Sequence, residues 1–150
     1  MKHIEIGNVC FKQACTFIVD GLENLESMKI GEKCFRNDYD ERNVGVCQIT
    51  NCPNLRQLDI GWMSFEYFKS FKLSNVNSLQ NVKFGEYCFR RVRKLVINGL
   101  ESLNSLRIGK NCFTIRDEER DDVVCLMAFQ ALRDGTREYQ NCDSPFGFED

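Results

Sequence analysis

The 150-residue sequence predicts a mostly β solenoid of about five 24-residue repeats, because one short pattern returns at a nearly fixed spacing. The pattern is Ile-Gly, two free residues, a small residue and Phe, with Phe replacing Ile in the fourth copy. Its glycines are 24, 30, 24 and 24 residues apart: Gly7, Gly31, Gly61, Gly85 and Gly109. The apolar positions between them recur as well, and of 32 aligned slots only Ser64 is not apolar.

Each repeat contains two apolar-x-apolar runs, such as Leu95-x-Ile97 and Leu106-x-Ile108. This alternation is typical of half-buried strands, so we expect short parallel strands stacked repeat on repeat in one or two narrow sheets. After the first run, Gly and Asn exchange at one position, which predicts a positive φ there. The glycines of the repeat pattern indicate either the same need or a close approach of neighbouring backbones.

The last residue of the pattern is always Phe, and we expect these rings to stack as one buried column: Phe11, Phe35, Phe65, Phe89 and Phe113. The small residue before it is usually cysteine. Stacked strands place equivalent Cβ atoms about 4.8 Å apart, whereas a disulfide needs about 3.8 Å, so we interpret these cysteines as reduced core residues. Disulfides and a metal site are the less favoured alternatives.

The nine cysteines and one histidine, His3, contain no Cys-x-x-Cys pair and no evident nucleophile–base pair. We therefore expect no metal, no cofactor and no enzymatic activity. Twenty basic and 22 acidic residues give a formal charge of −2, which does not favour nucleic-acid or anionic-membrane binding. No apolar run approaches the roughly 18 residues that span a bilayer. The N-terminus lacks the pattern of a signal peptide, so an intracellular location is favoured.

The segment LNSLRIGKNCF, from Leu103 to Phe113, resembles the core pattern of leucine-rich repeats, Leu-x-x-Leu-x-Leu-x-x-Asn-x-Leu. The Ile-Gly-x-x-Cys-Phe tail is similar to Ile-Gly-x-x-Ala-Phe of the BspA-like class. The resemblance covers residues 1–113 and implies the α/β leucine-rich-repeat superfamily, with a right-handed curved solenoid that makes protein–protein or adhesive contacts without activity. The Asn of the pattern is present only at Asn111, so no continuous asparagine ladder is expected along the stacked repeats.

The solenoid is expected over residues 1–113, followed at 114–150 by a last partial repeat and a C-terminal cap, for which a terminal helix and one more strand are the alternatives. Met1 aligns with the Leu25 position, so the first repeat is entered in its middle. We expect a second chain or further residues of a longer chain to cover the apolar residues at this end: Ile4, Ile6, Val9 and Phe11.

Departures from the repeat are the candidate sites. Trp62, Met63 and Tyr87 occupy the free positions after the glycine and are candidate interface anchors, with local packing as the alternative. Two charged insertions follow Phe35 and Phe113, and their carboxylates could favour basic partners or be solvated loops. The carboxylates are Asp38, Asp40 and Glu41 in the first insertion and Asp117, Glu118 and Glu119 in the second.

The sequence thus predicts a non-catalytic module that presents its repeat surface to a protein partner. One alternative is a structural subunit or a fragment of a longer repeat array. A weaker alternative is a glycan-binding surface around Trp62 and Tyr87.

Overall fold

The computed structural model describes residues 1–36, 45–90, 92–97, 100–109, 112–113 and 138–141. Every regular element in this part of the chain is a β-strand. The strands are β1 (His3–Ile6), β2 (Thr16–Asp20), β3 (Ser27–Ile30), β4 (Val46–Thr50), β5 (Gln57–Ile60), β6 (Ser70–Ser74), β7 (Asn81–Phe84), β8 (Lys94–Ile97), β9 (Ser105–Ile108) and β10 (Glu138–Asn141).

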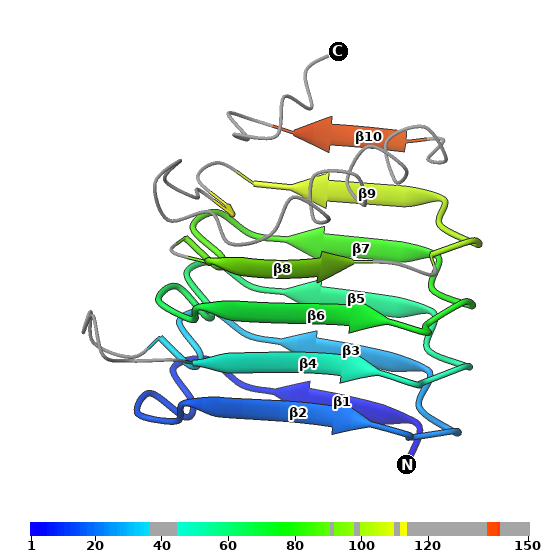
Figure 1. Cartoon of the computed structure of the whole chain (residues 1–150), viewed down its shortest axis with the longest axis horizontal. Coiled ribbons are helices and arrows are strands. Elements are labelled where there is room, and N and C mark those ends of the chain that lie inside the picture. The colour runs from blue at the N-terminus through cyan, green and yellow to red at the C-terminus, as the bar shows by residue number, and fades with distance from the viewer. Residues whose placement is uncertain (37–44, 91, 98–99, 110–111, 114–137, 142–150) are drawn as a thin grey trace.

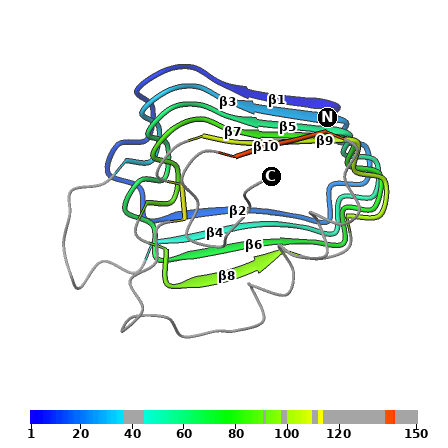
Figure 2. The ribbon, with the colours of Figure 1, turned by 90° about the horizontal axis from the view of Figure 1, so that it is seen from above.

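The chain winds as a right-handed β-solenoid of about four turns, which confirms the predicted fold class. Odd-numbered strands and β10 form a parallel six-stranded sheet in the order β1-β3-β5-β7-β9-β10, and the other strands form a four-stranded sheet, β2-β4-β6-β8 (Figure 1). Seen along the stack, the two sheets face each other across a narrow interior, with turns closing both sides (Figure 2).

Strand pairing follows the repeat alignment residue by residue. Ile4 pairs with Met28, and Met28 pairs with Leu58, so equivalent residues of successive repeats lie side by side. In β3, Met28 and Ile30 are buried whereas Lys29 between them is exposed. The apolar-x-apolar runs are therefore strands that each bury one face against the opposite sheet.

The phenylalanine column is present. Neighbouring rings lie nearly parallel at centroid distances of 5.1 Å (Phe11–Phe35), 4.8 Å (Phe35–Phe65), 5.1 Å (Phe65–Phe89) and 5.6 Å (Phe89–Phe113). Four of these rings are buried, but Phe11 is 58% exposed. The expectation of a fully buried column is wrong at Phe11, because this ring ends the column and is stacked on one side only.

The repeat glycines are explained by close backbone approach. A Cβ added to Gly61 would lie 2.6 Å from the carbonyl carbon of Gly31, and one added to Gly85 would lie 2.7 Å from the backbone nitrogen of Trp62. Real Cβ contacts are not this short, so each coil passes too close to its neighbour to admit a side chain. The predicted positive φ after the first strand is confirmed at Gly21 (74°), Asn51 (57°) and Asn75 (55°). Gly99 lies outside the described residues.

The small residue before the Phe donates a hydrogen bond. The sequence analysis missed this, because it interpreted the position as small and apolar. Its side chain donates to the carbonyl of the pattern glycine one repeat earlier: Cys34 to Gly7 (3.0 Å), Ser64 to Gly31 (2.7 Å), Cys88 to Gly61 (3.1 Å) and Cys112 to Gly85 (2.9 Å). Ser64 is thus equivalent to the cysteines in function. The slot cysteines Cys34, Cys88 and Cys112 are buried and form no disulfide, as expected.

Strand β10 extends the six-stranded sheet from within the region predicted as the C-terminal cap. It pairs in parallel with β9 along all four residues, from Glu138 beside Ser105 to Asn141 beside Ile108. The rest of the region predicted at 114–150 as a last partial repeat and a C-terminal cap, for which a terminal helix and one more strand were the alternatives, lies outside the described residues. In the part of the chain that the structure describes, no helix is long and apolar enough to cross a membrane.

Candidate interaction surface

The turns that follow β1, β3, β5 and β7 stack into one side of the solenoid, here called the glycine-turn edge (residues 7–9, 31–33, 61–63 and 85–87). Backbone hydrogen bonds join neighbouring turns along this edge. The Gly61 N–H donates to Ile30 O at 2.8 Å, while the Met63 N–H donates in the opposite direction to Glu86 O at 2.8 Å. The Lys33 N–H likewise donates to Trp62 O at 2.8 Å. The backbone that carries Trp62 is therefore held from two sides.

The second free residue of each turn adopts a left-handed backbone conformation. The φ values are 58° at Val9, 58° at Lys33, 60° at Met63 and 67° at Tyr87. This conformation costs an L-residue roughly 1–2 kcal/mol. It is an outlier for a β-branched residue such as Val9. The residue types therefore gave no sign of it, and the ladder of backbone hydrogen bonds is what sustains it.

Trp62, Met63 and Tyr87 lie on neighbouring turns of this edge with graded exposure. The Trp62 side chain is exposed, at 36%, whereas Met63 and Tyr87 are half-buried. The Lys33 ammonium lies 5.0 Å from the centre of the Trp62 ring, and the Arg90 guanidinium lies 5.4 Å from that of Tyr87. Each large aromatic group of the edge thus has a cation packed against its ring.

Arg90 also contacts a buried carboxylate that sequence reasoning missed. Glu66 is 1% exposed, and its Oε2 lies 3.5 Å from Arg90 Nη1 while its Oε1 accepts a 3.0 Å hydrogen bond from Arg36 Nε. These residues directly follow the Phe in three successive repeats. The sequence did contain a clue to this cluster: the slot after the Phe holds a glutamate in one repeat and an arginine in the repeat on either side. The three side chains therefore join three successive repeats through charged contacts.

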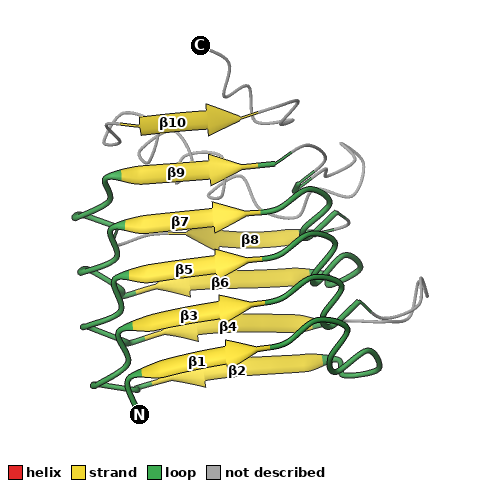
Figure 3. Cartoon of the chain, turned by 180° about the vertical axis from the view of Figure 1, so that it is seen from behind, coloured by secondary structure: helices red, strands yellow, loops and turns green. Residues whose placement is uncertain are grey.

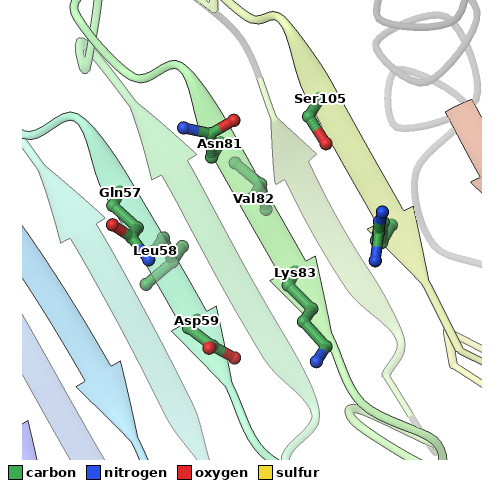
Figure 4. Close-up of a pocket in the computed structure, with 8 residues that line it drawn as sticks. Gln57, Leu58, Asp59, Asn81, Val82, Lys83 and Ser105 are labelled. Atoms are coloured by element: carbon green, nitrogen blue, oxygen red, sulfur yellow. The ribbon is translucent and has the colours of Figure 1, made fainter. Parts of the chain in front are cut away.

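A shallow hollow of about 170 Å³ lies on the outer face of the six-stranded sheet (Figure 4). It is lined by residues of three adjacent strands: Gln57, Leu58 and Asp59 of β5, Asn81, Val82 and Lys83 of β7, and Ser105 and Arg107 of β9. The outward positions in register form one row of neutral polar groups and one row of charged groups. The sequence showed these positions only as polar residues between apolar slots.

The charged row crosses the sheet with changing sign. Its members in register are Glu5, Lys29, Asp59, Lys83 and Arg107. At the hollow the row carries one carboxylate and two cations. The charged row runs alongside the glycine-turn edge, since in each repeat its member precedes the turn by a few residues, as Asp59 precedes Trp62 by three. An apolar anchor and a mixed-charge polar face therefore belong to the same repeats.

The predicted acidic site residues of the two insertions, at positions 38, 40 and 41 and at 117–119, lie outside the described residues. Their preference for basic partners therefore stays a prediction.

Within the described ranges, no group of three or more His, Cys, Asp or Glu side chains is placed to hold a metal ion. Burial raises the pKa of the Cys47 and Cys88 thiols well above the ordinary value of 9.0, and for Cys88 a hydrogen bond with Cys112 adds to the effect. Buried thiols with raised pKa values are poor nucleophiles and poor metal ligands at neutral pH.

Comparisons with protein-family models, with curated proteins and with solved structures found no match to this chain.

Proposed function

We propose that this protein is a non-catalytic binding module that holds a protein partner against the glycine-turn edge, with Trp62 as the central anchor. The observation that carries the proposal is the exposure of Trp62 on a backbone fixed from both sides. Outside the first coil (residues 1–26), Trp62 is the exposed large apolar side chain of the described residues. The same slot holds Asn8, Glu32 and Glu86 in the other described repeats, so the repeat itself does not require an aromatic residue.

The surroundings of Trp62 fit the anatomy of a protein interface. Tryptophan is enriched among interface hot spots, which are apolar centres surrounded by a polar rim. Here the rim consists of Glu32, Lys33 and Glu86 together with the polar hollow on the adjoining sheet. Because the turn backbone is already ordered, a partner would immobilise few additional groups, which lowers the entropic cost of binding.

The cation over the Trp62 ring does not prevent such contact. An exposed cation–π pair contributes roughly 0.5–1 kcal/mol. A well-packed tryptophan hot spot contributes about 2 kcal/mol or more. A partner that displaces the Lys33 ammonium therefore loses less than it gains. The resemblance of residues 1–113 to leucine-rich repeats, which implies protein–protein contacts, supports the same proposal.

The test uses a variant that the repeat itself supplies. Trp62→Glu introduces the residue found at Glu32 and Glu86, so the turn accepts its shape, and because three carboxylates then lie on adjacent turns, a thermal melt verifies that the variant is folded. The full-length chain is immobilised as bait, captured proteins are identified by mass spectrometry, and the dissociation constant of each purified candidate is measured by titration. Glu23→Ala, on the opposite turn side, is the matched control.

We expect the control to bind as the parent does and Trp62→Glu to raise the dissociation constant at least about 30-fold, the equivalent of about 2 kcal/mol. A Trp62→Glu variant that keeps both the partner and its dissociation constant would show that the edge is not the binding site.

A second candidate function is that of a structural subunit in a larger repeat assembly. It is favoured by a separate observation, the exposure of apolar side chains on the first coil. Such a subunit would be expected to associate through its end, whereas the binding module uses its side.

A further inference from the structure

The hollow on the outer face of the six-stranded sheet is lined by polar side chains, most of which have no polar partner among the described residues. Gln57, Asn81 and Ser105 form its neutral row in register, and within the described ranges none of the three side chains makes a hydrogen bond. The same row begins with His3 and Ser27, whose Nδ1 and Oγ are hydrogen-bonded at 2.6 Å. The row therefore pairs its side chains with each other at β1 and β3 and leaves them open to a ligand at the hollow.

The charged row changes its pattern at the same place. From β1 to β7 its charges alternate in sign, so that opposite charges are neighbours on adjacent strands: Glu5, Lys29, Asp59 and Lys83. At β9 the alternation ends, because Arg107 lies in register beside Lys83. Like charges directly opposite on neighbouring strands are unfavourable. A negative group held between these two cations would relieve their repulsion.

The charges of the hollow are also accessible. Lys83 is exposed and Asp59 is half-buried, and neither forms an ion pair within the described part of the chain, although the two are strand neighbours. Arg107 has further contacts in the protein and contributes its charge to the hollow. Figure 4 shows Asp59 and Lys83 towards one end of the hollow and the amide side chains of Gln57 and Asn81 towards the other.

We propose that the hollow binds an extended, acidic segment of the protein partner, with a carboxylate of that segment between Lys83 and Arg107. This inference rests on the proposed function, since the charged row of the hollow runs alongside the edge that carries Trp62. Ammonium and guanidinium groups donate charge-assisted hydrogen bonds to a carboxylate. A side-chain amide has both donors and an acceptor, so Gln57 and Asn81 can pair with the C=O and N–H groups of an extended backbone.

Asp59 determines on which side of Lys83 the acidic group lies. A carboxylate on the β5 side of Lys83 would face Asp59 and be repelled, so it is placed on the β9 side, beside Arg107. Asp59 can then accept a hydrogen bond from a backbone N–H of the segment. The three strands of the hollow span roughly 10 Å, the length of about three residues of extended chain. A short acidic segment therefore fills the site.

The first test uses two capped peptides as probes, pentaglutamate and pentaglutamine, titrated into the isotope-labelled full chain and followed by nuclear magnetic resonance. We expect pentaglutamate to shift the amide signals of Asn81, Lys83 and Ser105 and to leave those of Ser27 and Lys29, on the same face, unchanged. The shifts should diminish as salt is added, because exposed charges are screened. No shift at the hollow, or equal shifts with pentaglutamine, would overturn the proposal.

The second test compares two lysines of the charged row. Lys83→Gln introduces the residue type that continues the row at Gln140 on β10, and Lys83 is exposed, so the variant should fold. The matched control is Lys29→Gln, which removes the same charge from the row outside the hollow. We expect Lys83→Gln to raise the dissociation constant of pentaglutamate at least about tenfold and Lys29→Gln to change it less than about twofold. Equal effects of the two variants would overturn the proposal.

A third probe, the acidic polysaccharide polygalacturonate, separates a peptide from a glycan. Shifts at the hollow with polygalacturonate and none with pentaglutamate would assign the site to an acidic glycan and overturn the proposal. The peptide titration does not involve Trp62, so the hollow and the edge can fail separately. A partner dissociation constant that is unchanged by Trp62→Glu contradicts the proposed function, whereas an absent pentaglutamate shift at Lys83 contradicts the assignment of the hollow.

Discussion

Truncating Phe89 to alanine should destabilise the protein far more than truncating Phe11 in the same column. The Phe89 ring is fully buried and has neighbouring rings at 5.1 Å (Phe65), 4.3 Å (Phe71) and 5.6 Å (Phe113). Phe→Ala in a core costs about 3–5 kcal/mol. Aromatic pairs add to the cost of lost area, which places Phe89→Ala at about 4–5 kcal/mol. Phe11 has one stacked face and is more than half exposed, so Phe11→Ala should cost about 1 kcal/mol.

The two substitutions form a controlled pair because both residues have left-handed backbones, with φ of 52° at Phe89 and 55° at Phe11. Any strain on alanine is therefore common to both variants. Urea unfolding followed by circular dichroism, at concentrations low enough to keep the chain monomeric, measures the difference. With a slope of about 2 kcal/mol per molar urea, Phe89→Ala should lower the midpoint by about 2 M and Phe11→Ala by about 0.5 M. Equal shifts for both variants would refute the stacked-column account.

Three further outcomes are expected. Gly85→Ala should lower the unfolding free energy by about 1–3 kcal/mol through overpacking, whereas Gly7→Ala should be neutral or stabilising by up to about 1 kcal/mol. Equal effects of the two variants in thermal melts would contradict the explanation by close backbone approach. Ser64→Ala should cost about 1–3 kcal/mol because the buried Cys34 N–H and the partly buried Gly31 C=O lose their partner, and Ser64→Cys should recover most of it, which urea titration will check. Stability should be insensitive to Cys47 and Cys88 below pH 9 and fall above it, since the unfolded chain releases thiol protons that the folded chain retains; a flat profile in alkaline melts would argue against their burial.

The repeat alignment predicted most of the fold because a stacked parallel sheet requires strict register. Each apolar slot recurs at the spacing of the glycines, and shifting one strand by a residue would turn its buried side chains to solvent. Ile4 aligned with Met28 in the sequence and is its strand partner in the structure. The strand predicted after the first insertion, around Cys47 and Ile49, is also present as β4, which begins at Val46.

Features that depend on backbone contacts between coils were harder to predict. From the sequence, two explanations of the pattern glycines were equally open: a positive φ, or close packing against a neighbouring backbone. The structure decides for close packing at Gly61, because the backbone of the preceding turn leaves no room for a Cβ. The left-handed conformation falls instead on Met63, whose residue type gives no hint of it. The cysteine slot was interpreted as apolar because its side chains were expected to be buried. Its hydrogen bond was missed because the accepting glycine carbonyl belongs to the preceding repeat. Ser64 was the available clue.

The candidate site was predicted in part. Trp62 was recognised because it breaks the repeat, and it is exposed on the edge where the alignment placed it. The hollow beside it was not found, because it is formed by outward residues of three strands that are 24 residues apart in the sequence. Strand β10 was missed since Tyr139 is the single apolar residue in Glu138–Asn141, too little for a period-two signal.

The most direct test of partner binding at the glycine-turn edge is the intrinsic fluorescence of Trp62, the single tryptophan of the chain. The captured partner is titrated into the protein, with a tryptophan-free version of that partner where its own signal interferes. We predict a blue-shifted emission maximum and reduced quenching by acrylamide, both saturating with the independently measured dissociation constant. Full occupancy without any change in emission or quenching would contradict binding at this edge.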